Sequence, residues 1–314
     1  MDIFLSIVIA LAVSLASGPL IIKKLKEYRL GQQIRKIGPK HQVKQGTPTM
    51  GGLIFIVGIV VSALIMNRLA LNNLYLILGM LLFGFIGFVD DTAKIKKQQS
   101  EGLTSKQKIA MNIVFALIMA NVLNPTLANY QLQIPGLNQV IVLSPVVYFL
   151  FMIVFYTAVT NSVNLADGID GLCGSVSLIV AVFYIFYGLK TADPVVTIFA
   201  AAMAGALAGY LFFNWYPARV FMGDSGSFAL GGALATMAIL TKTELLFILV
   251  GLIYVIESLS VILQVGSMKL RGKRIFLMSP IHHHFEKKKW SETKIVGVFS
   301  LVTLISVAAA YLIS

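Results

Sequence analysis

The stretch FGFIGFVDDTAKIKK, residues Phe83 to Lys97, decides what kind of fold this chain can adopt. It begins as an apolar helix and stops on two adjacent carboxylates, Asp90 and Asp91, followed by a basic cluster. A carboxylate loses part of its hydration near a bilayer, so acids at membrane depth are costly and mark functional sites. The stretch therefore predicts a membrane helix that brings two acids to the interface.

The rest of the chain has the composition of a polytopic membrane protein. Of its 314 residues, 58% are hydrophobic and 12% are charged, and the mean hydropathy is +0.86, which excludes a soluble domain of this size. A helix of about 20 apolar residues spans the hydrocarbon core. We predict ten such helices in a single domain, residues 1–314. They cover residues 3–22, 51–66, 74–89, 109–123, 145–160, 172–189, 195–213, 228–240, 245–265 and 295–313.

The distribution of basic residues predicts the orientation. Alternate loops on one side of the ten helices carry 22 Lys and Arg residues, whereas the other side carries 3. The basic side is expected to be cytoplasmic, so both termini lie outside, in the periplasm or the extracellular space. Residues 129–142 alternate around Pro135 and Gly136, which predicts a short outer β-hairpin. Among partners we expect membrane lipids and no nucleic acid.

Three acidic motifs fall on the cytoplasmic side of this topology. Asp90 and Asp91 end the third apolar segment, and glycines at 79, 84 and 87 within it predict close helix contact. The segment NSVNLADGIDGL (161–172) carries Asp167 and Asp170, and FMGDSGS (221–227) carries Asp224. We expect all five carboxylates at one interface. The alternative interpretation treats them as helix caps or as partners of nearby lysines.

Asp224 is the candidate metal ligand. Gly223 and Gly226 flank it and let the main chain approach a ligand closely. Mg²⁺ binds proteins through one or two carboxylates and takes its other ligands from substrate phosphates and water. If the fifth apolar helix continues to Asp167, then Asn161, Asn164 and Asp167 share one face beside this site.

Basic and imidazole groups lie in the same cytoplasmic loops. Lys44 and Thr49 belong to HQVKQGTPTMGG (41–52), and Lys106 lies in the first turn of a helix that Thr104 and Gln107 cap. Free N–H groups there favour an anion, although Lys106 can equally be an ordinary interfacial lysine.

The segment SPIHHHFEKKKW (279–290) adds three consecutive histidines at 282–284. They lack the partners and spacing of a zinc site, so hydrogen bonding to phosphate or anchoring of the loop is favoured. These groups together indicate phosphoryl transfer between a nucleotide donor and a lipid acceptor, because those two reactants can meet only at the interface.

Five motifs together resemble a known enzyme family. VDD, NxxNLADGIDGL, FMGDSGSFALGG, GTPTMGG and SPIHHHFE are similar to those of the polyprenyl-phosphate N-acetylhexosamine-1-phosphate transferases, in particular the phospho-N-acetylmuramoyl-pentapeptide transferases. The resemblance implies Mg²⁺-dependent transfer from UDP-N-acetylmuramoyl-pentapeptide to undecaprenyl phosphate, which gives lipid I and UMP. It also implies peptidoglycan synthesis in the bacterial cytoplasmic membrane and a homodimer.

The resemblance implies roles for particular residues. Expected catalytic residues are Asp90, Asp91, Asp224 and His283, with Asp224 as the Mg²⁺ ligand. Phe221 is expected to stack on uracil, with Asn214 and Gln264 near the nucleoside. The remaining expected substrate-binding residues are Lys44, Thr49, Lys106, Asn164, Asp167, Asp170, His282 and His284.

The sequence is compatible with two mechanisms and with two other functions. We expect direct attack by the lipid phosphate, with Asp90 or Asp91 accepting its proton or orienting it; the rival is a covalent aspartyl-phosphate. A sister enzyme that transfers N-acetylglucosamine phosphate carries similar motifs. An ion-coupled transporter would place its acids near the membrane midplane, where only Glu257 fits.

Overall fold

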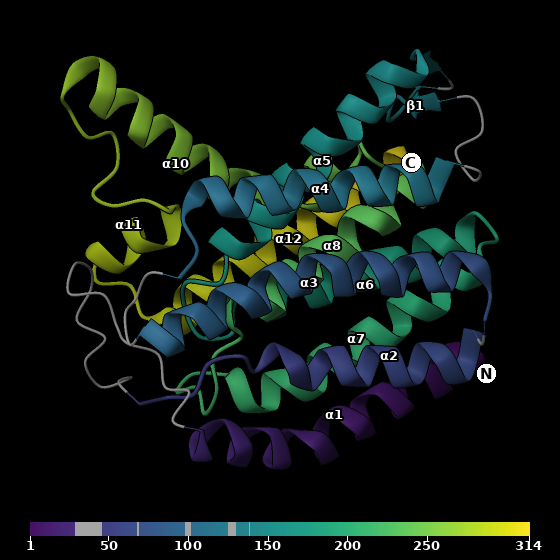
Figure 1. Cartoon of the computed structure of the whole chain (residues 1–314). Helices are drawn as coiled ribbons and strands as arrows, with labels where there is room; N and C mark the ends of the chain where they lie inside the picture. The colour runs from purple at the N-terminus through teal and green to yellow at the C-terminus, as the bar shows by residue number, and fades with distance from the viewer. Residues whose placement is uncertain (29–45, 68, 98–101, 125–129, 138) are drawn as a thin grey trace.

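Helices run side by side through most of the molecule (Figure 1). The computed structural model describes residues 1–28, 46–67, 69–97, 102–124, 130–137 and 139–314. Within these residues the helices are α1 (Asp2–Glu27), α2 (Gly52–Asn67), α3 (Leu71–Lys97), α4 (Ser105–Leu123), α5 (Pro145–Leu165), α6 (Leu172–Lys190), α7 (Pro194–Asn214), α8 (Gly223–Leu240), α9 (Phe247–Val250), α10 (Leu252–Arg271), α11 (Ile281–Lys287) and α12 (Glu292–Ile313).

The prediction of a helical membrane protein is confirmed in its coarse form. In the described residues, eight helices are long and apolar enough to cross a bilayer: α1, α3, α4, α5, α6, α7, α10 and α12. Each predicted apolar segment is helical, but α2 has 16 residues, and the ninth segment divides at Gly251 into α9 and α10. The count of ten spans therefore stays a prediction.

Helix α8 occupies the centre of the bundle and packs most closely on α3. Small residues make this contact possible. A Cβ at Gly79 would lie 2.1 Å from Thr236 Oγ1, and one at Gly84 would lie 3.0 Å from the Ala229 Cβ. The predicted close packing of the α3 glycines is thus confirmed, and it fixes the ends of α3 and α8 against each other.

A two-stranded antiparallel sheet lies at the end of the bundle away from α11 (Figure 1). β1 (Gln131–Gln133) pairs with β2 (Val140–Val142), with Leu132 opposite Ile141. The hairpin was predicted around the turn at Pro135 and Gly136. That this end faces outward stays a prediction.

A buried glutamate lies close to the sheet, between α8 and α9. Glu244 is 2% exposed, and its Oε1 accepts a 2.7 Å hydrogen bond from Tyr148 Oη. Lys242, which shares a cavity with Gln133 of β1, donates to the same Tyr148 oxygen. Burial raises the pKa of Glu244 from 4.5 to about 7, against the hydrogen bond from Tyr148 and the charge of Lys242.

This shift predicts how stability depends on pH. The folded protein holds the Glu244 proton more tightly than the unfolded chain does, so this proton contributes to the free energy of unfolding. The contribution is complete below pH 4.5 and is lost as the pH rises through about 7. The loss amounts to roughly 3 kcal/mol. We expect Glu244→Gln to remove this dependence. In thermal unfolding in detergent, the stability of the variant relative to the wild type should therefore rise between pH 5 and pH 8. Parallel pH profiles for the two proteins would contradict the assignment.

Candidate active site at the ends of α3 and α8

Three carboxylates from two distant parts of the chain meet at one end of the bundle. Asp90 and Asp91 lie in the last turns of α3, and Asp224 lies in the first turn of α8. One oxygen from each can be chosen so that all three lie within 4.8 Å of one another. The expected gathering of these acids is therefore present.

Asp91 caps helix α8. Its Oδ1 accepts from the Asp224 N–H at 3.2 Å, and its Oδ2 accepts from the Ser225 N–H at 2.9 Å. The first N–H groups of a helix have no partner within that helix, and the helix dipole favours a negative charge there. Asp91 thus fixes the position of Asp224, which is the cap that the alternative interpretation anticipated.

Two glycines allow this close approach. A Cβ at Gly87, one turn before Asp91, would lie 2.0 Å from the Asp224 carbonyl oxygen. Gly223 has a φ of +76°, and a Cβ there would lie 2.7 Å from both Asp91 Oδ2 and Thr49 Oγ1. Any larger residue at either position would separate α3 from the start of α8.

Two lysines that the sequence analysis did not single out complete the cluster. Lys94 Nζ lies 2.6 Å from Asp90 Oδ2 and 3.1 Å from Asp224 Oδ2. Lys108 Nζ, from α4, lies 3.0 Å and 2.7 Å from the same two oxygens. The spacing of Lys94 four residues after Asp90 is a sequence signal for the first pair; no comparable local signal identifies Lys108.

Asp90 joins the cluster to the segment before α4. It is fully buried, and its Oδ1 accepts a 2.7 Å hydrogen bond from the Leu103 N–H. The capping box of Thr104 and Gln107 is present as predicted. It places Lys106 on an exposed face, whereas Lys108 reaches the carboxylates.

Asn164 and Asp167 approach Asp224 from the end of α5. Asn164 Nδ2 donates to Asp224 Oδ1 at 3.1 Å and to Ser227 Oγ at 2.9 Å. The condition for a shared face of Asn161, Asn164 and Asp167 is not met, because α5 ends at Leu165. Burial, together with the negative charges of Asp224 and Asp91, raises the pKa of Asp167 well above its usual range.

The turn that follows is fastened to the loop between α7 and α8. Asp170 Oδ2 accepts from the Ala218 N–H at 3.0 Å, and Asn214 Oδ1 accepts from the Gly171 N–H at 3.0 Å. Asn214 also donates to the Val220 carbonyl. Asp170 and Asn214 therefore hold the backbone on which Phe221 and Asp224 are carried.

Phe221 and Thr49 belong to two backbone segments that lie against each other. The Phe221 N–H donates to the Pro48 carbonyl, and the Phe221 carbonyl accepts from the Gly51 N–H, both at 2.8 Å. Phe221 is half-buried and Thr49 is buried. Lys44 lies outside the described residues.

Each of the three histidines has a partner within the protein. His282 is buried, with its Nδ1 3.0 Å from Glu257 Oε1, and His283 contacts Glu286. His284 Nδ1 accepts from the Leu277 N–H, and partial burial together with Lys288 lowers the pKa of His284.

His282 and Gln264 fix neighbouring loops. A Cβ at Gly168 would lie 2.1 Å from His282 Nε2, so His282 packs on the turn beside Asp167. Gln264 Oε1 accepts from the N–H groups of Ile275 and Phe276. Its amide therefore organises the loop that leads to the histidines.

The chemistry of this cluster suits a divalent cation. Asp224 Oδ2 attracts two ammonium groups, and its side chain is 17% exposed, against 0% for Asp90 and 2% for Asp91. Carboxylate oxygens are the ligands that hard cations take, and a cation at Asp224 would replace the two ammonium groups as the partner of its negative charge. Asp224 is thus the most accessible ligand of the three.

Comparison with known proteins first defines a class, a membrane-embedded transferase of sugar phosphates. Residues 73–242 match the model of glycosyl transferase family 4, and residues 44–56 match signature 1 of the phospho-N-acetylmuramoyl-pentapeptide-transferases. The family model covers α3 to α8 and so includes all three clustered carboxylates.

Curated relatives narrow the class to one family. A phospho-N-acetylmuramoyl-pentapeptide-transferase of Clostridium beijerinckii is 49% identical over 93% of this chain and 90% of its own length. The transferase of the same name from Clostridium perfringens is 48% identical over 96% of this chain and 96% of its own length. The one from Clostridium acetobutylicum is 44% identical over 99% of this chain and 98% of its own length. The chain belongs to the phospho-N-acetylmuramoyl-pentapeptide transferase family. With eight candidate spans among the described residues, it is a multi-pass bacterial membrane protein.

Proposed function

We propose that this protein transfers phospho-N-acetylmuramoyl-pentapeptide from its UDP-linked donor to undecaprenyl phosphate, which gives lipid I and UMP. The observation that carries the proposal is the cluster in which Asp90, Asp224, Lys94 and Lys108 lie in mutual contact at one end of a membrane bundle. Such a cluster combines a cation site with ammonium groups for phosphates.

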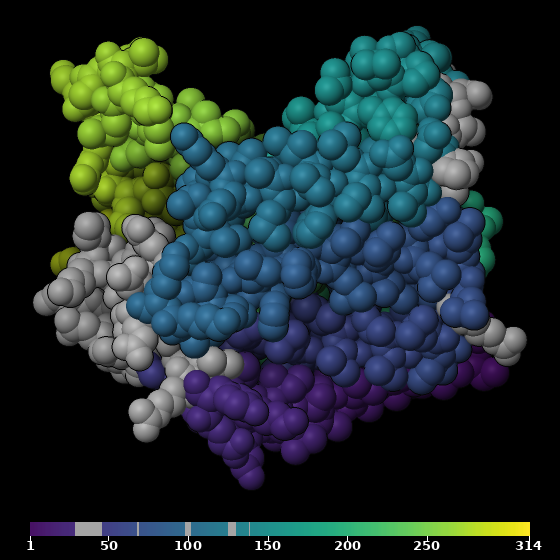
Figure 2. Space-filling model, in the orientation of Figure 1, coloured from purple at the N-terminus to yellow at the C-terminus, as the bar shows by residue number. Residues whose placement is uncertain are grey.

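We propose a path for the lipid on the surface above α4. Figure 2 shows a hollow between α10 and α5. Both helices carry exposed apolar side chains, including Ile262 on α10 and Val154 on α5. A polyprenyl chain can lie in this hollow with its phosphate at the carboxylate cluster. We place the cluster at the cytoplasmic face of the inner membrane, in agreement with the excess of Lys and Arg in the loops on that side.

We assign Mg²⁺ to Asp224, with Asp91 holding the first turn of α8 in place. When bound, the ion would neutralise charge on the donor diphosphate. Asn164 orients the Asp224 carboxylate through Oδ1. Lys94 and Lys108, which pair with Asp224 in this structure, would be the donors to phosphate oxygens when a cation holds that carboxylate.

The reaction that we favour is a single displacement. An oxygen of the lipid phosphate attacks the β-phosphorus of the donor, and the bond to the UMP oxygen breaks as the new bond forms. Asp90 is our choice to orient the lipid phosphate or accept its proton, because its Oδ2 faces both lysines, whereas both oxygens of Asp91 already accept backbone N–H groups.

Donor binding uses the surrounding loops. We propose that Phe221 stacks on uracil, with Asn214 and Gln264 shaping the nucleoside pocket through the loops they hold. The diphosphate would lie near the histidines, with His283 as a candidate catalytic residue. The other proposed substrate contacts are Lys44, Thr49, Lys106, Asn164, Asp167, Asp170, His282 and His284.

A direct assay tests this proposal. Purified protein should release UMP when it is given Mg²⁺, undecaprenyl phosphate and UDP-N-acetylmuramoyl-pentapeptide together, and release none when any one is omitted. Product from UDP-N-acetylglucosamine alone would instead identify the sister activity. Ion flux through reconstituted protein without any transfer would support a transporter.

The mechanism has its own test. In a single displacement, labelled UMP does not exchange into the UDP-linked donor when the lipid acceptor is absent. Exchange at a rate comparable with turnover would show a covalent aspartyl-phosphate and would overturn the proposed step.

The resemblance also suggests that residues 1–314 form one domain that assembles as a homodimer. Mass measurement of the detergent-solubilised protein tests the oligomeric state, and a monomer at working concentrations would contradict that part of the proposal.

A further inference from the structure

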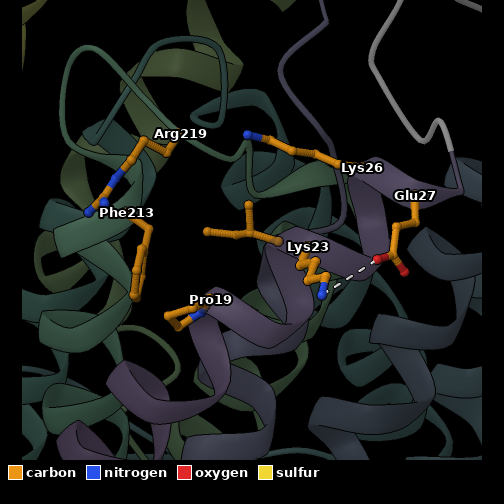
Figure 3. Close-up of a pocket in the computed structure, with 7 residues that line it drawn as sticks. Pro19, Lys23, Lys26, Glu27, Phe213 and Arg219 are labelled. Atoms are coloured by element: carbon orange, nitrogen blue, oxygen red, sulfur yellow. Dashed lines mark ion pairs between the residues drawn. The ribbon is translucent and has the colours of Figure 1, made fainter.

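A second cavity, of about 430 Å³, lies between the end of α1 and the residues that follow α7 (Figure 3). Its wall is apolar, formed by Pro19 and Ile22 of α1 and Phe213 of α7. Its rim is charged, because Lys23, Lys26 and Arg219 surround it together with one carboxylate. None of these residues belongs to the carboxylate cluster of the proposed active site.

The rim carries a net positive charge. The carboxylate, Glu27, lies 4.0 Å from Lys23 Nζ, and both side chains are more than half exposed. Figure 3 shows Lys23 turned toward Glu27, whereas Lys26 extends over the cavity toward the loop that carries Arg219. Among the described lining residues, Lys26 and Arg219 are therefore the charges left to attract an anion.

Arg219 is held in a fixed position. Its Nη2 donates a 2.7 Å hydrogen bond to the Phe212 carbonyl, and its guanidinium lies 4.8 Å and 4.9 Å from the ring centroids of Phe212 and Phe213. A guanidinium stacked in this way loses little further freedom on binding, and its other N–H groups suit a phosphate.

The apolar wall is also built by the fold. A Cβ at Gly18 would lie 2.3 Å from the Phe213 ring, so only glycine there lets that ring pack against α1. Pro19, Leu20 and Ile22 continue the apolar surface of α1 toward its basic last turn. The cavity thus combines an apolar wall with a cationic rim where a candidate membrane span ends.

We propose that this cavity binds an anionic phospholipid, with the headgroup phosphate between Lys26 and Arg219 and an acyl chain along Pro19, Ile22 and Phe213. Charge complementarity favours a lipid over a second copy of the chain, whose net charge of +12 would bring repulsion to the same rim. The proposal does not depend on the transferase activity.

Native mass spectrometry of the delipidated full-length protein in a non-ionic detergent tests it. The probes are dioleoyl phosphatidylglycerol and dioleoyl phosphatidylcholine, titrated without nucleotide or polyprenyl phosphate. We expect the phosphatidylglycerol to bind more tightly. Lys26→Gln and Arg219→Gln should each weaken its binding about fivefold, the effect of one interfacial charge.

Lys24→Gln is the matched control, because Lys24 is an exposed cation on the same helix that does not line the cavity. It should change phosphatidylglycerol binding by less than twofold. Equal losses of phosphatidylglycerol binding in Lys24→Gln and Lys26→Gln would show that the effect comes from general surface charge, and would overturn the proposed site.

Two other results would also overturn it. Competition by inorganic phosphate at the same concentration as the lipid would show a site for free anions. A shift from dimer to monomer in Lys26→Gln and Arg219→Gln, with lipid binding unchanged, would show that the rim contacts a second copy. Size-exclusion profiles that match the wild type establish that each variant is folded.

Discussion

Asp224→Asn is expected to lower kcat for UMP release by roughly three orders of magnitude. The change removes the charge that attracts Lys94, Lys108 and the proposed cation, while the amide keeps an oxygen for Asn164. A loss of several kcal/mol of charge stabilisation in the transition state corresponds to a loss of this size. The measurement is UMP release as a function of Mg²⁺ concentration, and the Mg²⁺ dependence should also disappear or move to much higher concentration.

Asp193→Asn is the matched control. Asp193 caps α7 at the end of that helix remote from the cluster, with its Oδ1 accepting from the Val196 N–H at 3.0 Å. Asparagine is an equally good cap, so activity should stay within about twofold of the wild type. Near-normal turnover by Asp224→Asn, with an unchanged Mg²⁺ profile, would remove the metal assignment.

Gly87→Ala should lower activity at least 100-fold without touching any charged group. The added Cβ would lie 2.0 Å from the Asp224 carbonyl oxygen, so the first turn of α8 must move away from α3. A displacement of about 1 Å at a catalytic group can cost that factor in rate. Overpacking should also lower the free energy of unfolding by about 1 to 3 kcal/mol. UMP release and thermal unfolding in detergent measure the two effects.

Gly297→Ala provides the comparison for this second change. Gly297 lies on an exposed face of α12, and a Cβ there meets nothing within 4 Å. That substitution should leave activity unchanged and raise stability slightly, since glycine is unfavourable inside a helix. Full activity in Gly87→Ala would mean that the contact between α3 and α8 does not set the position of Asp224.

The fold was predictable where the length of an apolar segment indicates a membrane helix. Each predicted segment became a helix, because an uninterrupted apolar run can satisfy its backbone groups in a bilayer only in that way. The division at Gly251 and the end of α5 at Leu165 were not predicted. Both depend on local backbone geometry that leaves little trace in composition.

At the site, the motifs predicted that Asp90, Asp91 and Asp224 gather, but not which contacts each carboxylate makes. Asp91 was proposed from its position beside Asp90, yet the pattern does not reveal that both of its oxygens cap α8. Lys108 was missed for a related reason: its partners are Asp90 and Asp224, from two other helices, and a tertiary contact of this kind has no fixed spacing along the chain.

The sequence left two interpretations of these acids as alternatives, one structural and one functional, and the structure is compatible with both. Asp91 is a helix cap, while Asp90 and Asp224 are lysine partners. These structural roles place the carboxylates where a cation can reach one of them, so they are compatible with the proposed catalysis.

The central claim is that a divalent cation binds where Asp224 meets the end of α3. The most direct measurement is the anomalous difference density of Mn²⁺ in crystals of the purified protein grown with that ion in place of Mg²⁺. We predict a single strong peak within coordination distance, about 2.0 to 2.2 Å, of an Asp224 carboxylate oxygen. A peak at the histidines of α11, or the absence of one near Asp224 at saturating Mn²⁺, would contradict the claim.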